Sequence, residues 1–187
     1  MNRLLLAVVI AAIGCGAQSM PAESQLDEIA RAATAMVDGD RCQLIVTPRA
    51  LAYMVKKDPR DPWVDADNYD VNDSPFIAVK KTLIRLSTLA DYPVDVNLWL
   101  PVPGVGSRVQ IVIRNRNELS QFWEWGQLTQ EMFPEMRAVL TTGKRVTVKQ
   151  KPGLTSVLSP VRNSLGEIVG LVEVVTRTIP DVRENVK

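Results

Sequence analysis

The hydrophobic pattern of the chain changes its period at Pro93. Before this residue, apolar side chains from Leu26 to Val37 recur every three or four positions, which is the spacing of one helix face. After it, apolar and polar residues alternate from Val94 to Leu100, which is the spacing of a strand. Because the helices precede the strands rather than alternating with them, we predict an α+β fold with a mostly antiparallel sheet.

Three helices are predicted before Pro93, each beginning near a hydroxyl side chain that can cap a helix. In two of them a proline follows the hydroxyl, at Thr47-Pro48 and Ser74-Pro75, and proline is favoured at the first helical position. The predicted helices cover residues 24–37, 50–57 and 76–90.

Five strands are predicted after Pro93, joined by turn sequences that contain proline, asparagine and glycine. The segment between the second and third strands is predicted to be a helical crossover, with one helix from Asn117 to Trp125 and another that ends at Gly143. The predicted strands cover residues 94–100, 108–114, 144–150, 155–162 and 168–177.

The beginning of the chain has the features of an export signal. Met1-Asn2-Arg3 is positively charged, and an uninterrupted apolar stretch runs from Leu4 to Ile13. A helix of this length would cross about half of a ~30 Å hydrocarbon core. A secretory signal peptide in residues 1–14 is therefore predicted rather than a transmembrane helix.

The segment Ala12-Ile13-Gly14-Cys15 resembles the lipobox of bacterial lipoproteins. The resemblance implies cleavage before Cys15 and a diacylglycerol on its thiol. Gly16 in the next position is more similar to outer-membrane than to inner-membrane lipoproteins, so we expect a lipid anchor on the periplasmic side of the outer membrane. The alternative is an ordinary signal peptide that is cleaved after Ser19 or Ala22.

The exported part of the chain is predicted to be a single domain, since about 165 residues can enclose one core. A tether of residues 15–23 precedes the domain, and a polar tail of residues 180–187 follows it. Without Arg3 the basic residues number 21, as many as the acidic residues, and no basic cluster stands out. Nucleic acid is therefore not an expected partner. The domain covers residues 24–179, with helices in 24–92 and the sheet and crossover in 93–179.

The chain contains no histidine. This excludes Ser-His-Asp and Cys-His catalysis and histidine-ligated zinc or haem. Cys42 lies in an apolar run that extends to Val46, so it is predicted to be a buried structural residue. No spacing singles out a carboxylate pair, lysine or tyrosine as catalytic, and we expect neither an enzyme nor a cofactor.

The acidic segment of residues 65–73 could offer carboxylate oxygens to calcium. It departs from the EF-hand pattern, with Tyr69 at the fifth position, Asp70 where glycine is needed and Phe76 at the twelfth. A solvated loop without a metal is therefore predicted.

Residues 159–174, with the sequence SPVRNSLGEIVGLVEV, resemble the closing hairpin of Cache domains, the PAS-like extracytoplasmic sensor modules of bacterial receptors. In that family a strand ending in Pro-hydrophobic-Arg turns through Asp/Ser-x-Gly into hydrophobic-Val-Gly-hydrophobic. Thr142-Gly143-Lys144 before a strand is also typical, as is the order of two strands, a helical excursion and three strands. The resemblance covers Val94 to Arg177 well. It covers the first third only loosely, because family members usually begin with one long helix.

The resemblance implies a small-molecule ligand, often a carboxylate or an amine, held between the sheet and the crossover. A guanidinium group suits a carboxylate, and an indole ring supplies a flat apolar wall with one donor. The aromatic residues could instead pack the crossover onto the sheet, and the arginines could be solvated. The candidate ligand-binding residues are Arg114, Arg116, Trp123, Trp125 and Trp99.

The expected function is that of a membrane-tethered sensory domain which binds a small molecule. Because the sequence contains no output region, such a domain would act through a separate protein, for example an envelope receptor. The alternative is a non-catalytic structural or protein-binding lipoprotein with the same fold and a filled core. That alternative predicts side chains packed solidly between the sheet and Trp123.

Overall fold

The structure is a computed structural model that describes residues 22–54, 71–124, 127 and 129–177. In the described part of the chain four helices precede the sheet, whereas three are predicted from the sequence. The unforeseen helix is short and begins after Asp38, whose side chain accepts a hydrogen bond from the backbone N–H of Arg41. The four helices are α1 (Ala22–Met36), α2 (Gly39–Gln43), α3 (Pro48–Met54) and α4 (Asp73–Ser87).

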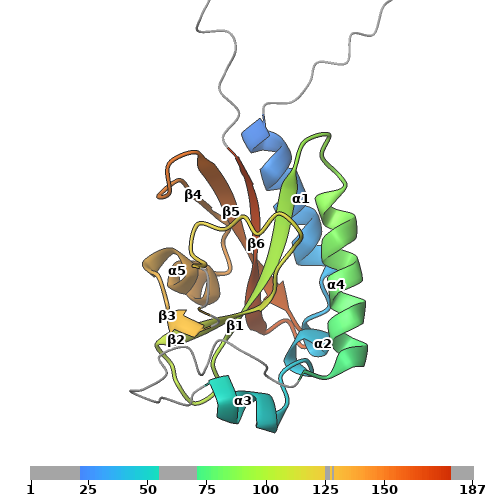
Figure 1. Cartoon of the computed structure of the whole chain (residues 1–187), viewed down its shortest axis with the longest axis vertical. Coiled ribbons are helices and arrows are strands. Elements are labelled where there is room, and N and C mark those ends of the chain that lie inside the picture. Colours follow the sequence, from blue (N-terminus) through green and yellow to red (C-terminus); the bar gives the residue numbers. More distant parts are fainter. Residues whose placement is uncertain (1–21, 55–70, 125–126, 128, 178–187) are drawn as a thin grey trace, which may run out of the picture.

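The strands form one open antiparallel sheet, in the order β3-β2-β1-β6-β5-β4 (Figure 1). This confirms the α+β class, but the prediction of five strands is wrong because the sheet has six. The additional strand, β3, pairs with the outer edge of β2 and is too short to show an alternating pattern. The strands are β1 (Val94–Pro101), β2 (Arg108–Ile113), β3 (Thr129–Glu131), β4 (Val146–Val148), β5 (Leu154–Arg162) and β6 (Ile168–Arg177), and α5 (Pro134–Thr142) lies between β3 and β4.

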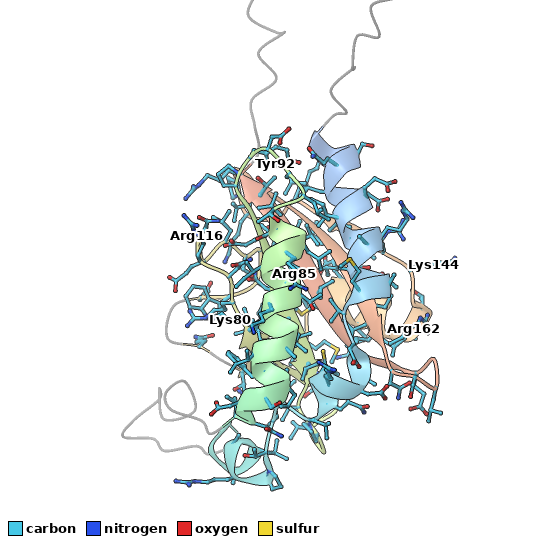
Figure 2. The ribbon with its side chains drawn as sticks, turned by 90° about the vertical axis from the view of Figure 1, so that its right-hand side faces the viewer. Lys80, Arg85, Tyr92, Arg116, Lys144 and Arg162 are labelled. Atoms are coloured by element: carbon cyan, nitrogen blue, oxygen red, sulfur yellow. The ribbon has the colours of Figure 1, made fainter. Side chains whose placement is uncertain are left out.

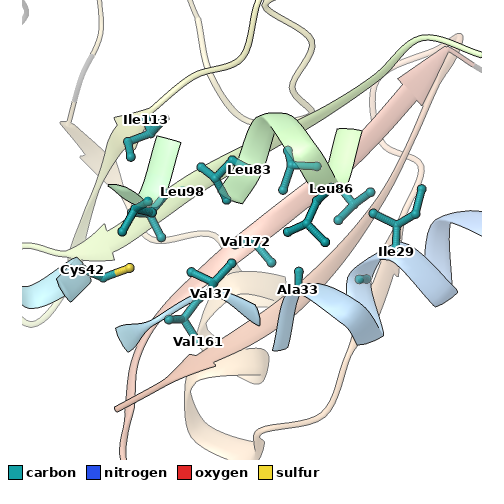
Figure 3. Packing of buried hydrophobic residues seen from close by; sticks show 14 of the residues in the cluster. Ile29, Ala33, Val37, Cys42, Leu83, Leu86, Leu98, Ile113, Val161 and Val172 are labelled. Atoms are coloured by element: carbon teal, nitrogen blue, oxygen red, sulfur yellow. The ribbon is translucent and has the colours of Figure 1, made fainter. Parts of the chain in front are cut away.

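Helices α1 and α4 cover one face of the sheet, and α5 lies on the other face (Figure 1). The apolar stripe predicted for the first helix is buried against the sheet, where Ile29, Ala33 and Val37 meet Leu86 and Val172 (Figure 3). Complete burial of a leucine or isoleucine side chain contributes about 1.5–3 kcal/mol. This cluster therefore supplies a large share of the hydrophobic stabilisation of the domain.

Two glycines allow backbone segments to approach closely. A Cβ atom on Gly39, at the start of α2, would lie 2.3 Å from the carbonyl oxygen of Arg162. A Cβ atom on Gly170, in β6, would lie 2.8 Å from the carbonyl oxygen of Trp99. Both distances are too short for a side chain, so these positions require glycine for steric reasons.

None of the helices in the described segments has both the length and the apolar sequence needed to cross a membrane.

Candidate functional site

The face of the sheet opposite α1 and α4 is covered by α5 and by the segment that follows β2, residues 114–124, which is called the crossover from here on. Phe122 of the crossover is 2% exposed, and its ring meets the ring of Trp99 edge-on at a centroid distance of 6.3 Å. Phe133, just before α5, lies 5.0 Å from the ring of Phe122. Buried apolar residues of the sheet and α5, including Met136 and Leu158, complete the cluster. Among the described residues, side chains of the protein itself therefore pack between the sheet and the crossover.

A carboxylate stands at the centre of this face. Glu173 of β6 is 0% exposed, and in the sheet it lies between Asn97 of β1 and Leu158 of β5. Five donors surround its two oxygens. Oε1 accepts from the backbone N–H of Gln121 at 2.6 Å and from Ser156 Oγ at 2.9 Å. Oε2 accepts from Ser120 Oγ at 2.6 Å, Trp99 Nε1 at 3.2 Å and Asn97 Nδ2 at 3.4 Å. Such a set of partners is what a buried carboxylate needs to replace water.

Two opposing effects set the pKa of Glu173. Burial disfavours the charged form and raises the pKa above its usual value. The hydrogen bonds from Ser120, Gln121, Ser156 and Trp99 favour the charged form and offset part of this increase. Because desolvation is the larger effect, the carboxyl group keeps its proton to a higher pH than an exposed glutamate does.

A second buried carboxylate, that of Asp95 in β1, holds the beginning of the crossover. Its Oδ1 accepts from the backbone N–H of Asn117 at 3.3 Å and from Nδ2 of the same residue at 2.9 Å. Its Oδ2 accepts from the backbone N–H of Leu119 at 2.9 Å. Asn97 follows Asp95 by two residues in β1, and its side-chain Nδ2 donates to the carbonyl of Leu119 at 2.7 Å. The two strand carboxylates thus fix consecutive parts of one segment.

These contacts explain why the helix predicted from Asn117 is wrong. In the part of that segment which the structure describes, residues 117–124 are irregular. The backbone N–H groups of Asn117, Leu119 and Gln121 donate to carboxylates of the sheet rather than to carbonyl groups of a preceding helical turn. The later helix of the predicted crossover is confirmed as α5.

The crossover is also joined to the turn between β4 and β5. The side chain of Gln121 donates to the carbonyl of Leu154 at 2.8 Å and accepts from the backbone N–H of Lys151 at 2.6 Å. The Lys151 ammonium donates to the carbonyl of Trp123 at 3.0 Å. Residues 117–123 are thereby attached to three different parts of the sheet.

The structure brings two of the predicted ligand-binding residues together. The guanidinium carbon of Arg114 lies 4.1 Å from the ring centroid of Trp123, and an Arg114 nitrogen lies 3.7 Å from a carboxylate oxygen of Glu118. The indole Nε1 of Trp123 is buried and has no hydrogen-bond partner among the described residues. This stacked pair is partly exposed at the edge of the crossover.

Of the other predicted ligand-binding residues, Trp99 belongs to the buried cluster against which Trp123 packs, and Arg116 lies at a separate pocket. Trp99 is 1% exposed, and its indole N–H is bonded to Glu173. Arg116 is exposed and lines a pocket of about 330 Å³ together with Tyr92 and Asn117, beside the end of α4. Trp125 lies outside the described residues, as do the proposed lipidation site Cys15, the leader, the tail from residue 180 and residues 65–70 of the acidic segment.

Sequence reasoning did not identify Glu173 and Asp95 as organising residues. Each is a charged residue in a strand whose residues are nearly all buried, with Glu173 in the run Leu-Val-Glu-Val-Val and Asp95 in Val-Asp-Val-Asn-Leu. A charged residue in a strand that is buried on both faces is rare unless it has partners. That signal could have identified both positions, although not the segment that covers them.

The remaining chemistry of the described part is limited. Cys42 is buried, and desolvation together with the nearby Asp38 raises the pKa of its thiol to about 12. Within the described ranges no group of cysteine and acidic side chains is arranged to hold a metal ion. In comparisons with known proteins, no family model and no curated protein matches the chain.

Proposed function

We propose that this chain is an exported, lipid-anchored module of the Cache type which binds a protein partner and whose core is filled by its own side chains. The anchor is the lipid expected on Cys15, on the periplasmic side of the outer membrane. The module has no catalytic role in this proposal and acts on its partner by contact.

The order of the elements supports the Cache resemblance. Two strands, an excursion that contains α5 and three strands connected by short turns follow one another along the chain. The hairpin that carries the family-like residues is formed by β5 and β6, which pair along nearly their whole length. The short strand β3 lies within the excursion and leaves this order unchanged.

The observation that carries the proposal is the occupied space beneath the crossover. Trp99 and Phe122 fill its apolar part, and Glu173 uses both oxygens to hold residues of the same chain. A ligand that entered here would have to displace these hydrogen bonds, and each hydrogen bond to a charged group contributes about 1.5–3 kcal/mol. Binding of a small molecule at this place is therefore opposed by the folded structure itself.

A second function, the binding of a small carboxylate or amine, is favoured by one specific feature. The guanidinium group of Arg114 stacks on the ring of Trp123, whose buried indole N–H lacks a partner among the described residues. An anionic group could accept from both donors. Such a site would lie at the edge of the crossover rather than beneath it.

Thermal shift measurements separate the two functions. With organic acids, amino acids and amines, we expect no increase in the melting temperature if the module binds only protein. An increase that is lost in Arg114→Ala, but kept in the exposed control Arg137→Ala, would instead favour the small-molecule function.

Membrane attachment is tested separately. The variant Cys15→Ser should be released from membranes and remain folded. If it stays in the membrane fraction, the lipid anchor is wrong.

A further inference from the structure

The outer side of α4 carries apolar residues that its amphipathic pattern does not explain. The helix buries Pro75, Val79, Leu83 and Leu86 against the sheet. Ile77 and Ile84 lie on the opposite side and are 49% and 44% exposed. Because they are seven residues apart, they lie on one line along the helix, about 10 Å from each other.

Basic side chains accompany these two isoleucines. Lys81 lies between them along the helix, four residues after Ile77 and three before Ile84. Arg85, one turn after Lys81, is a second exposed basic residue of α4 (Figure 2). In the described part of the chain, neither Lys81 nor Arg85 forms an ion pair. The outer face of α4 therefore combines exposed apolar surface with positive charge that is not compensated by a described carboxylate.

The same face borders a groove. A hollow of about 690 Å³ lies beside α4, and α2 contributes Arg41 to its wall. Among the described residues, its charged lining consists of Arg41, Lys81, Arg85 and the acidic Asp73. Arg41 is ion-paired with Asp38 at 3.1 Å, so the uncompensated positive charge comes from Lys81 and Arg85. The hollow extends from Asp73 to Arg85 along α4, which corresponds to about 18 Å at 1.5 Å per residue. This length accommodates three turns of a partner helix.

We propose that the α4 groove binds an acidic amphipathic helix of a partner protein. Ile77, which lines the groove, and Ile84, which lies further along the exposed side of α4 outside the groove lining, would contact the apolar residues of that helix. Lys81 and Arg85 would lie beside its glutamates or aspartates. Apolar anchors at helical spacing in a groove, flanked by complementary charges, are a common mode of peptide recognition. This inference rests on the proposed protein-binding function and names the surface that performs it.

An anionic membrane is the other anionic surface that a tethered protein could meet. The helices α1 and α4 run antiparallel along the long axis of the domain, and α1 begins at the end where α4 finishes (Figure 1). The α4 groove therefore lies along the side of the domain rather than at the end where α1 begins (Figure 1). A concave groove also fits a protruding helix better than a flat bilayer.

Peptide binding to the purified domain tests the surface. The probe is a fluorescent 16-residue helical peptide with leucines at positions i, i+3, i+4 and i+7 and glutamates beside them. The comparison peptide has lysines in place of the glutamates. We expect the acidic peptide to bind and the double variant Lys81→Glu/Arg85→Glu to weaken its affinity about tenfold, which equals about 1.4 kcal/mol. The lysine peptide should bind at least tenfold more weakly than the acidic one.

The matched control is Arg137→Glu/Lys144→Glu, which changes the net charge equally at two exposed positions away from α4. It should keep the wild-type affinity, and circular dichroism should show that both double variants are folded. Equal affinity of the wild type and Lys81→Glu/Arg85→Glu for the acidic peptide would overturn the proposal. So would tighter binding of vesicles with 30% phosphatidylglycerol than of the peptide, or occupation of the groove by a second copy of the chain.

Photo-crosslinking of the full-length protein in its own envelope separates this inference from the proposed function. A photoreactive residue at Ile84 should capture a partner through an acidic amphipathic segment that mass spectrometry can identify, whereas the same residue at Arg137 should not. Capture from other surfaces but not from Ile84 would overturn only the α4 groove. Failure to capture any protein from every exposed position would contradict the protein-binding function itself and the groove with it.

Discussion

The backbone N–H of Gln121 donates to Oε1 of Glu173 at 2.6 Å, across 52 residues of sequence. This bond joins the middle of the crossover to the middle of the sheet. Because Glu173 is fully buried, water cannot replace the donor if the bond is broken. The crossover and the sheet therefore depend on each other for their structure.

Replacing the carboxylate should destabilise the fold. In Glu173→Gln, an NH₂ group takes the place of one acceptor oxygen and faces donors such as Trp99 Nε1 or the N–H of Gln121. We expect the free energy of unfolding to fall by about 2–3 kcal/mol in urea denaturation. The control Glu167→Gln, in an exposed turn, should stay within about 0.5 kcal/mol of the wild type. A change equally small in Glu173→Gln would show that the buried hydrogen bonds do not stabilise the domain.

The stability contributed by Glu173 should depend on pH. Since burial raises its pKa in the folded state, the folded protein binds more protons than the unfolded chain over the interval from the usual value of 4.5 to the raised value. The stability from this group is present below pH 4.5 and is lost as the pH rises through the raised pKa. Unfolding measured from pH 4 to 8 should show this decrease in the wild type and not in Glu173→Gln. Parallel curves for the two proteins would contradict the raised pKa.

Hydrogen exchange should reveal the attachment of the crossover to Asp95. The amides of Leu119 and Gln121 should be protected although residues 117–123 have no regular secondary structure. In Asp95→Ala, exchange at Leu119 should accelerate at least tenfold, since its acceptor is removed, whereas Gln121 should change less. Asp95→Asn retains one acceptor oxygen, so its exchange rate at Leu119 should lie between the rates of the wild type and of Asp95→Ala. Uniform acceleration of both amides would indicate that the crossover opens as a single unit.

Glycine 39 offers a steric test of the packing between α2 and the end of β5. The methyl group of Gly39→Ala would overlap the backbone of Arg162, at 2.3 Å from its carbonyl oxygen. We expect a loss of about 1–3 kcal/mol, typical of an overpacked contact, and a lower melting temperature. Gly106→Ala is the matched control, because no atom lies within 4 Å of the added Cβ. If both variants melt together, the close approach of α2 to β5 is not maintained in solution.

Cys42 should be unreactive in the folded protein. With a pKa of about 12, only about one thiol in ten thousand is ionised at pH 8, and the sulfur is also buried. In the Cys15→Ser variant, a disulfide-exchanging reagent should label Cys42 at the rate of unfolding and rapidly in denaturant. Fast labelling without denaturant would place the thiol at the surface.

Local patterns in the sequence predicted the elements that depend on near neighbours. The helical spacing from Leu26 to Val37 and the alternation from Val94 to Leu100 correspond to α1 and β1. The turn residues predicted the hairpin of β5 and β6, because a tight turn needs particular backbone angles that few residues adopt. These signals lie within a few positions of the structure that they specify.

The crossover could not be predicted in this way. The residues around Asn117 predict a helix cap, but its backbone N–H donates to the carboxylate of Asp95, 22 residues away. The extra strand β3 likewise exists because the edge of β2 offers unpaired groups to it. In both places, partners that are distant in sequence outweigh local preference.

The α+β class, the positions of most helices and strands and the exclusion of histidine chemistry follow from the amino-acid sequence, because periodicity and residue type are local properties. The use of the second face of the sheet depends instead on contacts between distant segments. A buried charge must find donors wherever the fold can supply them, and for Glu173 the donors are Ser120 and Gln121 of the crossover together with residues of β1 and β5. Those partners became identifiable only when segments far apart in the sequence were placed side by side.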